Sequence, residues 1–257
     1  MSIEFGFEKK MLSVLIDLKK NYGLKGIKAE CEAEGSNLND LNRLSRLTTK
    51  SNVGFYVKIG GVEAIRDIYD CYECGVDGII APMVETNFAA KKFIDSIKKI
   101  PFKKRPSLTI NIETIQGIKN IESISKSFCR DLKNITIGRS DLVGSLFNKN
   151  INVNSSEIVD LIRKAYSITK KYNIELFVGG GVSNKTLEIF NKNNFLRKNI
   201  KCVETRKVIF ETAKILKKNA LKKAMEFEKL YIMSKKEYSD MRITSELLRL
   251  SKLNERL

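Results

Sequence analysis

Residues 55–81 read FYVKIGGVEAIRDIYDCYECGVDGIIA, and this stretch decides the fold. Its two ends, residues 55–59 and 78–81, are short runs of apolar and β-branched residues, which predict strands. Between them, residues 62–74 place apolar side chains at helical spacing, which predicts a helix. A strand, a helix and a second strand in this order are typical of a parallel sheet covered by helices.

The same alternation extends over most of the chain from residue 26 onward. Gly78-Ile-Ile-Ala and Ile135-Thr-Ile are continuous apolar runs, as expected for parallel strands that are buried on both faces. The sequence therefore predicts an α/β fold, a TIM (β/α)8 barrel. The predicted strands are residues 27–31, 55–59, 78–81, 107–112, 134–137, 175–178 and 201–203. Because a closed barrel needs eight strands, we expect a weakly marked one at residues 2–5.

The pattern changes after residue 208. We expect a long helix to about residue 233, then an amphipathic helix over residues 239–257, and no further strand. This divides the chain into a TIM-barrel domain at residues 1–204 and a helical extension at residues 205–257. The extension carries an apolar stripe that favours packing on a partner subunit over binding to RNA or a membrane, and the stripe contains Ile243, Leu247, Leu250 and Leu253.

Composition excludes several classes of enzyme. The 257 residues include no His, which rules out catalytic triads with His and His-ligated zinc sites. Lys and Arg outnumber Asp and Glu by 47 to 30, a net charge of +17, but lysine is spread over the whole chain, so we expect no nucleic-acid partner. No apolar run is long enough to cross a membrane, and five scattered cysteines without a secretory segment predict free thiols and a cytoplasmic protein.

Polar residues follow the predicted strands at the edge where barrel enzymes place their active sites. Glu113 and Asp141 end neighbouring strands, and two such carboxylates can share a hard divalent ion, Mg²⁺ or Mn²⁺. Lys58 ends another strand and supplies a cation for an acidic substrate. The alternative for each residue is a purely structural role, as a helix cap or as a solvated charge in a loop. A glycine-rich turn at residues 179–181 fits a phosphate site or a tight turn equally well.

Four segments together resemble the HpcH/HpaI aldolase and citrate lyase β-subunit-like family. They cover roughly residues 25–210 in the family's order, and they are Lys58-Ile-Gly-Gly, residues 75–86, Ile112-Glu-Thr-Ile-Gln-Gly117 and Ile137-Gly-Arg-Ser-Asp-Leu142. The resemblance implies a phosphoenolpyruvate/pyruvate-type TIM barrel with Glu113 and Asp141 as Mg²⁺ or Mn²⁺ ligands. It also implies reversible carbon–carbon bond cleavage through a metal-bound enolate, and a homo-oligomer assembled through the C-terminal helices.

This chain departs from that family at two places. Gly35 stands where 2-oxo-acid aldolases of the family carry a histidine, after the acidic run Glu32-Ala-Glu34. Lys58 stands where they carry an arginine, so a substrate carboxylate loses its bidentate partner, and we expect Arg139 to grip the anion instead. Without histidine, the candidates for the general base are a metal-bound hydroxide, Glu34 and Glu85.

The sequence thus predicts an enzyme, a metal-dependent carbon–carbon lyase acting on a 2-oxo acid. Lys58, Glu34 and Arg139 are the predicted catalytic residues. The predicted substrate-binding residues are Lys58, Glu85, Gly138, Arg139 and Ser140. Two alternatives remain open: an acyl-CoA lyase or thioesterase, and a non-catalytic barrel with a basic binding tail.

Overall fold

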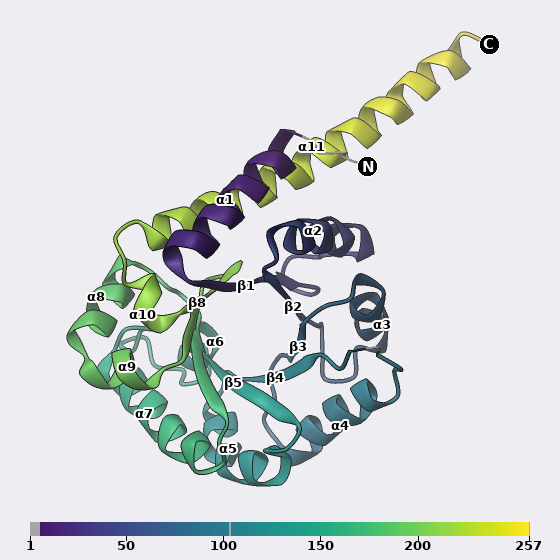
Figure 1. Cartoon of the computed structure of the whole chain (residues 1–257). Coiled ribbons are helices and arrows are strands. Elements are labelled where there is room, and N and C mark those ends of the chain that lie inside the picture. The colour runs from purple at the N-terminus through teal and green to yellow at the C-terminus, as the bar shows by residue number, and fades with distance from the viewer. Residues whose placement is uncertain (1–5, 103, 257) are drawn as a thin grey trace.

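The computed structural model describes residues 6–102 and 104–256 and shows a closed eight-stranded barrel surrounded by helices (Figure 1). The strands follow one another around the barrel in chain order: β1 (Leu24–Glu30), β2 (Gly54–Lys58), β3 (Gly78–Ala81), β4 (Ser107–Ile112), β5 (Leu132–Gly138), β6 (Glu175–Gly179), β7 (Cys202–Glu204) and β8 (Val208–Glu211). The TIM-like fold predicted from the sequence is confirmed.

Helices alternate with the strands and cover the outside of the barrel. They are α1 (Gly6–Tyr22), α2 (Leu38–Ser51), α3 (Ile65–Cys74), α4 (Asn87–Lys98), α5 (Ile115–Phe128), α6 (Arg139–Gly144), α7 (Ser156–Lys171), α8 (Asn184–Lys192), α9 (Asn194–Asn199), α10 (Thr212–Ile215) and α11 (Ala220–Asn254). Side chains cap several of these helices where they leave the strands. Thr86 and Thr114 each accept a backbone hydrogen bond from the first turn of α4 and α5, which fixes how the chain leaves β3 and β4.

The eighth strand differs from the prediction. Residues 2–5 lie outside the described part of the chain, and the slot between β7 and β1 is filled by β8, which runs antiparallel to both. The prediction of a helix directly after residue 208 is therefore wrong. Thr205 closes a tight hairpin onto Val208 through paired hydrogen bonds, and the buried run Val208-Ile-Phe then pairs as a strand. The barrel thus includes residues up to 211, while the division into two domains stays a prediction.

A small cluster of side chains around the Tyr56 ring packs at the amino end of the barrel. Tyr56 packs there with the buried side chains of Phe177, Cys202 and Ile209. A Cβ atom on Gly26 or Gly78 would lie 2.4 or 2.5 Å from the Tyr56 ring, so glycine is required at both positions. These residues come from β1, β2, β3, β6, β7 and β8, so the cluster joins six of the eight strands at this end of the barrel.

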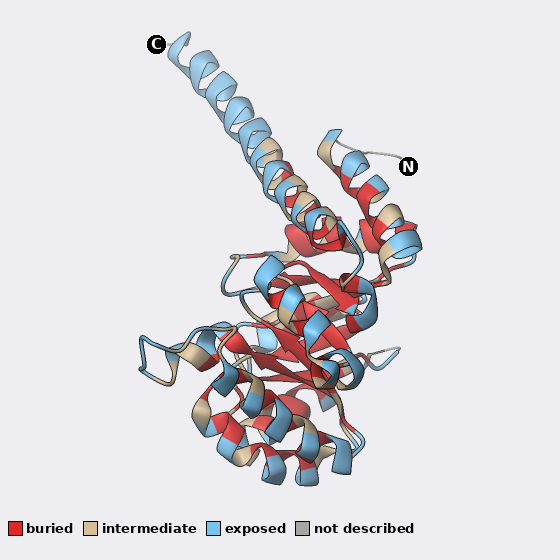
Figure 2. Ribbon diagram, turned by 90° about the vertical axis from the view of Figure 1, so that its left-hand side faces the viewer, coloured by how far each residue is buried: buried red, intermediate tan, exposed pale blue. Residues whose placement is uncertain are grey.

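Two long helices pack side by side next to the barrel and extend beyond it (Figures 1 and 2). α11 is one continuous helix of 35 residues, where the sequence predicted two. Its first half packs on α1 and the barrel through Leu221, Phe227 and Tyr231, whereas residues 239–256 are exposed on all sides. No helix within residues 6–102 and 104–256 is long and apolar enough to span a membrane.

Candidate active site

A cavity of about 470 Å³ opens at the carboxyl ends of the parallel strands. The strands supply its floor and inner wall, the loops after β5 and β6 supply one side, and the start of α11 supplies the rim. Its lining includes Lys28, Glu30, Lys58, Asn111, Glu113, Thr136, Gly138, Ser140, Asp141, Gly179, Gly180, Glu204, Arg206, Met225 and Glu228. The predicted residues Lys58, Glu113, Gly138, Ser140 and Asp141 are therefore brought together in one cavity.

Glu113 directly follows β4 and is almost completely buried in this cavity, with 3% of its surface exposed. Its carboxylate accepts hydrogen bonds from the Met83 amide at 3.1 Å and from the Asn111 side chain at 3.4 Å. Burial raises the pKa of Glu113, against the opposing effects of Lys58 and the Met83 amide. A Cβ atom on Gly138 would lie 2.3 Å from the Glu113 Oε2 atom, so the carboxylate occupies space that only glycine leaves free.

Asp141 lies in the first turn of α6, directly after β5, and its charge is close enough to raise the pKa of Glu113 further. Asn111, on β4, adds another oxygen, since its buried Oδ1 atom has no hydrogen-bond partner. Two carboxylates and one amide oxygen are the hard donors that Mg²⁺ and Mn²⁺ prefer. The described residues contain no group of three or more Asp, Glu, Cys or His side chains that would enclose a metal by itself. An ion here would keep coordination positions for water and substrate.

The floor of the cavity is a buried ion pair that the sequence analysis missed. The Lys28 ammonium on β1 lies 3.1 Å from Glu204 on β7, and the Thr136 hydroxyl on β5 donates to Glu204 at 3.1 Å. Burial alone would lower the pKa of Lys28, but Glu204 and Glu30 outweigh it and raise the pKa, so Lys28 stays charged. The sequence did hold a signal for this pair: Lys28 and Glu204 are charged residues within parallel strands, where apolar residues are expected on both faces.

Glu30, the last residue of β1, is the meeting point of three cations. Its Oε1 atom lies 3.5 Å from Lys28, and its Oε2 atom lies 3.8 Å from Lys58 and 3.5 Å from Arg206. Burial raises the pKa of Glu30, but the charges of these three cations and of Lys207 outweigh it and hold the pKa below its ordinary value. Arg206 comes from the β7–β8 hairpin, which the sequence did not predict.

Arg139 lies beside the cavity but does not face it. Its guanidinium donates to the carbonyl oxygens of Gly179, Gly180 and Val153 at 2.7–3.1 Å, and only 2% of the residue is exposed. Burial lowers its pKa to about 10, which still leaves it protonated at neutral pH. Arg139 therefore holds the glycine-rich turn in place, and Gly180, at φ +80°, packs directly on the backbone of Ser140.

The two predicted carboxylate bases are not among the residues that line the cavity. Glu34 is paired with Lys207, whose ammonium also lies over the Tyr231 ring. Glu85 accepts a 2.6 Å hydrogen bond from Thr114, the residue that caps α5. Both carboxylates thus have structural partners outside the cavity.

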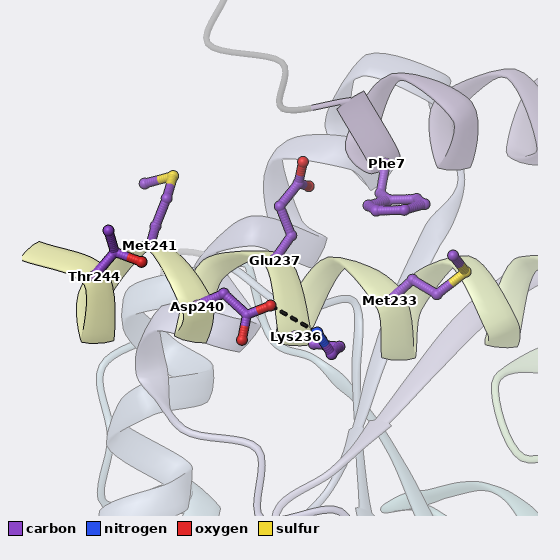
Figure 3. A pocket seen from close by; sticks show the side chains of 7 residues that line it. All are labelled: Phe7, Met233, Lys236, Glu237, Asp240, Met241 and Thr244. Carbon is purple, nitrogen blue, oxygen red and sulfur yellow. Dashed lines mark hydrogen bonds and ion pairs between the residues drawn. The ribbon is translucent and has the colours of Figure 1, made fainter.

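Other features of the molecule are less suited to catalysis. A hollow of about 580 Å³ lies between Phe7 of α1 and the middle of α11, and its Lys236 and Asp240 side chains pair with each other along one helix (Figure 3). The predicted free thiols are confirmed, since none of the five cysteines forms a disulfide. Burial raises the pKa of Cys31 to about 12 and of Cys74 to about 11, so these thiols are unreactive at neutral pH.

The model of the HpcH/HpaI aldolase/citrate lyase family matches residues 48–187, more than half of the chain, and the chain belongs to this family. An HpcH/HpaI aldolase/citrate lyase family protein from Burkholderia cenocepacia J2315 superposes with a TM-score of 0.62 at 10% identity, over 77% of this chain and 82% of that one. An HpcH/HpaI aldolase from Desulfitobacterium hafniense DCB-2 gives 0.60 at 13% identity, over 74% and 80%.

A third solved structure, of the citrate synthase SbnG, superposes with a TM-score of 0.60 at 16% identity, over 85% of this chain and 89% of that one. At these identities the likeness shows the fold alone. No curated protein matches the chain.

Proposed function

We propose that this protein is a divalent-metal-dependent carbon–carbon lyase of the aldolase type, acting on a 2-oxo acid such as a pyruvate-like compound. The observation that carries the proposal is the meeting of Glu113, Asp141 and Lys58 in one cavity at the carboxyl ends of the strands. Family membership supports the same class of reaction.

Glu113 and Asp141 would hold the ion, with Asn111 as a further oxygen donor. When bound, Mg²⁺ or Mn²⁺ supplies a positive charge that polarises a substrate carbonyl. The ion also offsets the cost of keeping the Glu113 carboxylate charged while it is buried and close to Asp141.

The chain's own cations recognise the acidic substrate. Lys58 is half-buried at the end of β2 and its charge reaches both Glu30 and Glu113, so a substrate carboxylate can bind between these two sides of the cavity. Lys28 keeps a positive charge on the floor, where it stabilises negative charge that develops on the substrate. Arg139 takes no direct part, because its donors are used by backbone carbonyls.

The test measures exchange of the pyruvate methyl protons in D₂O by NMR, with Mg²⁺ or Mn²⁺ and with a chelator. We expect metal-dependent exchange, and cleavage of 4-hydroxy-2-oxo acids to pyruvate and an aldehyde. Absence of exchange with every metal, together with turnover of acyl-CoA esters, would favour the acyl-CoA alternative. Absence of both, with steep salt-dependent binding of RNA, would favour a non-catalytic barrel.

We also propose that the protein is a cytoplasmic homo-oligomer in which the free part of α11 packs on a second copy. Ile243, Leu247 and Leu250 lie three or four residues apart, and each is 53–60% exposed. A single helix of this length gains little stability without packing, and an apolar stripe at this spacing suits a second helix. Sedimentation of the full chain and of a chain ending at residue 238 tests this, and a monomeric full chain would contradict it.

A further inference from the structure

The proposed reaction needs a group that moves a proton, and this chain has no histidine. Five carboxylates line the cavity: Glu30, Glu113, Asp141, Glu204 and Glu228. Glu113 and Asp141 are taken by the proposed ion. Glu228 lies on α11 at the rim of the cavity, where it is half-buried, and not on one of the barrel strands.

Glu204 is also poorly placed for proton transfer. Only 2% of the residue is exposed, and its two oxygen atoms are used by Lys28 and by the Thr136 hydroxyl. If Glu204 took up a proton, the buried Lys28 ammonium would keep one charged carboxylate, Glu30, instead of two. Loss of a partner charge is costly for a buried ammonium group.

Glu30 lies between this floor and the mouth of the cavity. All three of its cationic neighbours line the cavity, but Lys28 is held by Glu204 on the floor. The other two are Lys58 at the end of β2 and Arg206, whose side chain is 50% exposed on the hairpin. Among the described residues, Glu30 is the carboxylate that pairs with each of them, at 3.8 Å from Lys58 and 3.5 Å from Arg206. An incoming substrate carboxylate would compete with the Glu30 carboxylate for these two cations, because the two anions carry the same group.

We propose that Glu30 is the catalytic base, and that the substrate's own carboxylate activates it by drawing Lys58 and Arg206 away from it. This inference rests on the proposed lyase function. The Glu30 carboxylate takes a proton from the carbon next to the substrate carbonyl. The C–H bond breaks, an O–H bond forms on Glu30, and the electron pair forms a carbon–carbon double bond and leaves the negative charge on the carbonyl oxygen.

The surroundings of Glu30 explain why this activation depends on substrate. In the free chain it faces Lys28 from its own strand, Lys58 from β2, and Arg206 and Lys207 from the hairpin. Lys207 is already paired with Glu34, whose carboxylate also accepts a hydrogen bond from the Glu30 backbone amide, and Lys28 is shared with Glu204. Once Lys58 and Arg206 turn to the substrate, Glu30 keeps only Lys28 and Lys207, each of which is shared with another carboxylate, and this raises its basicity in a buried site.

The test compares Glu30→Gln with the wild-type chain in the pyruvate proton-exchange assay. We expect the exchange rate to fall at least about 100-fold, while oxalate binding in the presence of Mg²⁺ stays as tight or becomes tighter, because Lys58 and Arg206 lose a competing anion. Glu175→Gln is the matched control, since Glu175 also lies between two lysines, Lys25 and Lys201, but at the opposite end of the barrel.

Two further readouts separate a catalytic from a structural role. The exchange rate of the wild-type chain should rise with pH along a single titration that Glu30→Gln lacks, and Glu30→Asp should restore part of the rate. Exchange by Glu30→Gln at the wild-type rate, while Glu113→Gln is inactive, would overturn this inference and leave the lyase function standing. A wild-type chain that exchanges no protons with any metal would overturn both. If Glu30→Gln fails to fold, Glu30→Asp takes its place: it should exchange more slowly than the wild-type chain, and the wild-type rate in that variant would overturn the inference.

Discussion

The two ends of this barrel are built from the same strands in opposite ways. At the amino end, the Tyr56 ring packs against Phe177 and against strands that carry glycine. Two residues further along the same strands, the inward positions carry charge, as at Lys58 on β2 and Glu204 on β7. Because alternate residues of a strand face the same side, the cluster around Tyr56 and the charged cavity are only two residues apart along the same strands.

This comparison indicates how the fold separates stability from chemistry. The cluster around Tyr56 buries apolar surface, which stabilises the closed barrel. The carboxyl end instead gathers three cations around Glu30 and keeps Glu113 buried, an arrangement that is costly unless a ligand uses it. Substitutions at the two ends should therefore affect different properties.

The largest effect is expected for Glu113→Gln at the carboxyl end. Removing one ligand charge should lower the metal-dependent exchange rate on the order of a thousandfold, which corresponds to about 4 kcal/mol. The fold should persist, since the amide keeps the shape and the hydrogen bond from Met83. NMR exchange assays check the rate, and Glu175→Gln at the amino end serves as the control. Wild-type exchange by Glu113→Gln would remove Glu113 from the metal site.

Tyr56→Ala tests the other end. Loss of the ring should lower the free energy of unfolding by about 3 kcal/mol, because the glycines around it cannot fill the space. Urea unfolding measures the change. Tyr69→Ala is the matched control, since Tyr69 is 54% exposed and its truncation should change stability little. Equal effects of the two substitutions would show that the cluster around Tyr56 does not stabilise the closed barrel.

Gly138→Ala should affect the carboxyl end alone. The added methyl group would overlap the Glu113 carboxylate and displace it, so we expect exchange to fall about 10- to 100-fold with a smaller change in the unfolding free energy. Gly144→Ala, in the following helix, has open space around the new methyl group and is the control. If the two variants keep the same activity, the position of Glu113 is less critical than its burial indicates.

The strands of the barrel were predictable because parallel strands buried on both faces leave apolar runs such as Gly78-Ile-Ile-Ala in the sequence. β8 was not predictable, since its four residues stand directly before a helix and their sequence fits a strand or the start of that helix. Its pairing with β7 in a hairpin makes it a strand. Glu113, Asp141 and Lys58 were found because strand ends converge at one edge of a barrel. Lys28 lies in the middle of a strand, and its inward direction depends on the register.

The role of Arg139 could not be predicted either, for a different reason. Its position two residues before Asp141 is fixed by the sequence, but the direction of its side chain depends on carbonyl oxygens of Gly179 and Val153, which come from other parts of the chain. The same holds for Glu34, whose partner Lys207 lies on the unpredicted hairpin. The sequence predicts which residues lie near one another along the chain, whereas the direction of each side chain depends on partners from distant parts of the fold.

The smallest expected effect concerns acid stability at the carboxyl end. The pKa of Glu30 is lower in the folded chain than its ordinary value of 4.5, because its cations prefer the charged form. Glu30 therefore contributes stability that is present above pH 4.5 and is lost as the pH falls through its lower native pKa. Glu30→Gln should be less stable than the wild-type chain by about 1 kcal/mol at pH 7, and the difference should shrink towards zero as the pH falls below 4.5. Urea unfolding across this pH range measures it, and parallel stability curves for the two chains would show that the cations do not stabilise the Glu30 carboxylate.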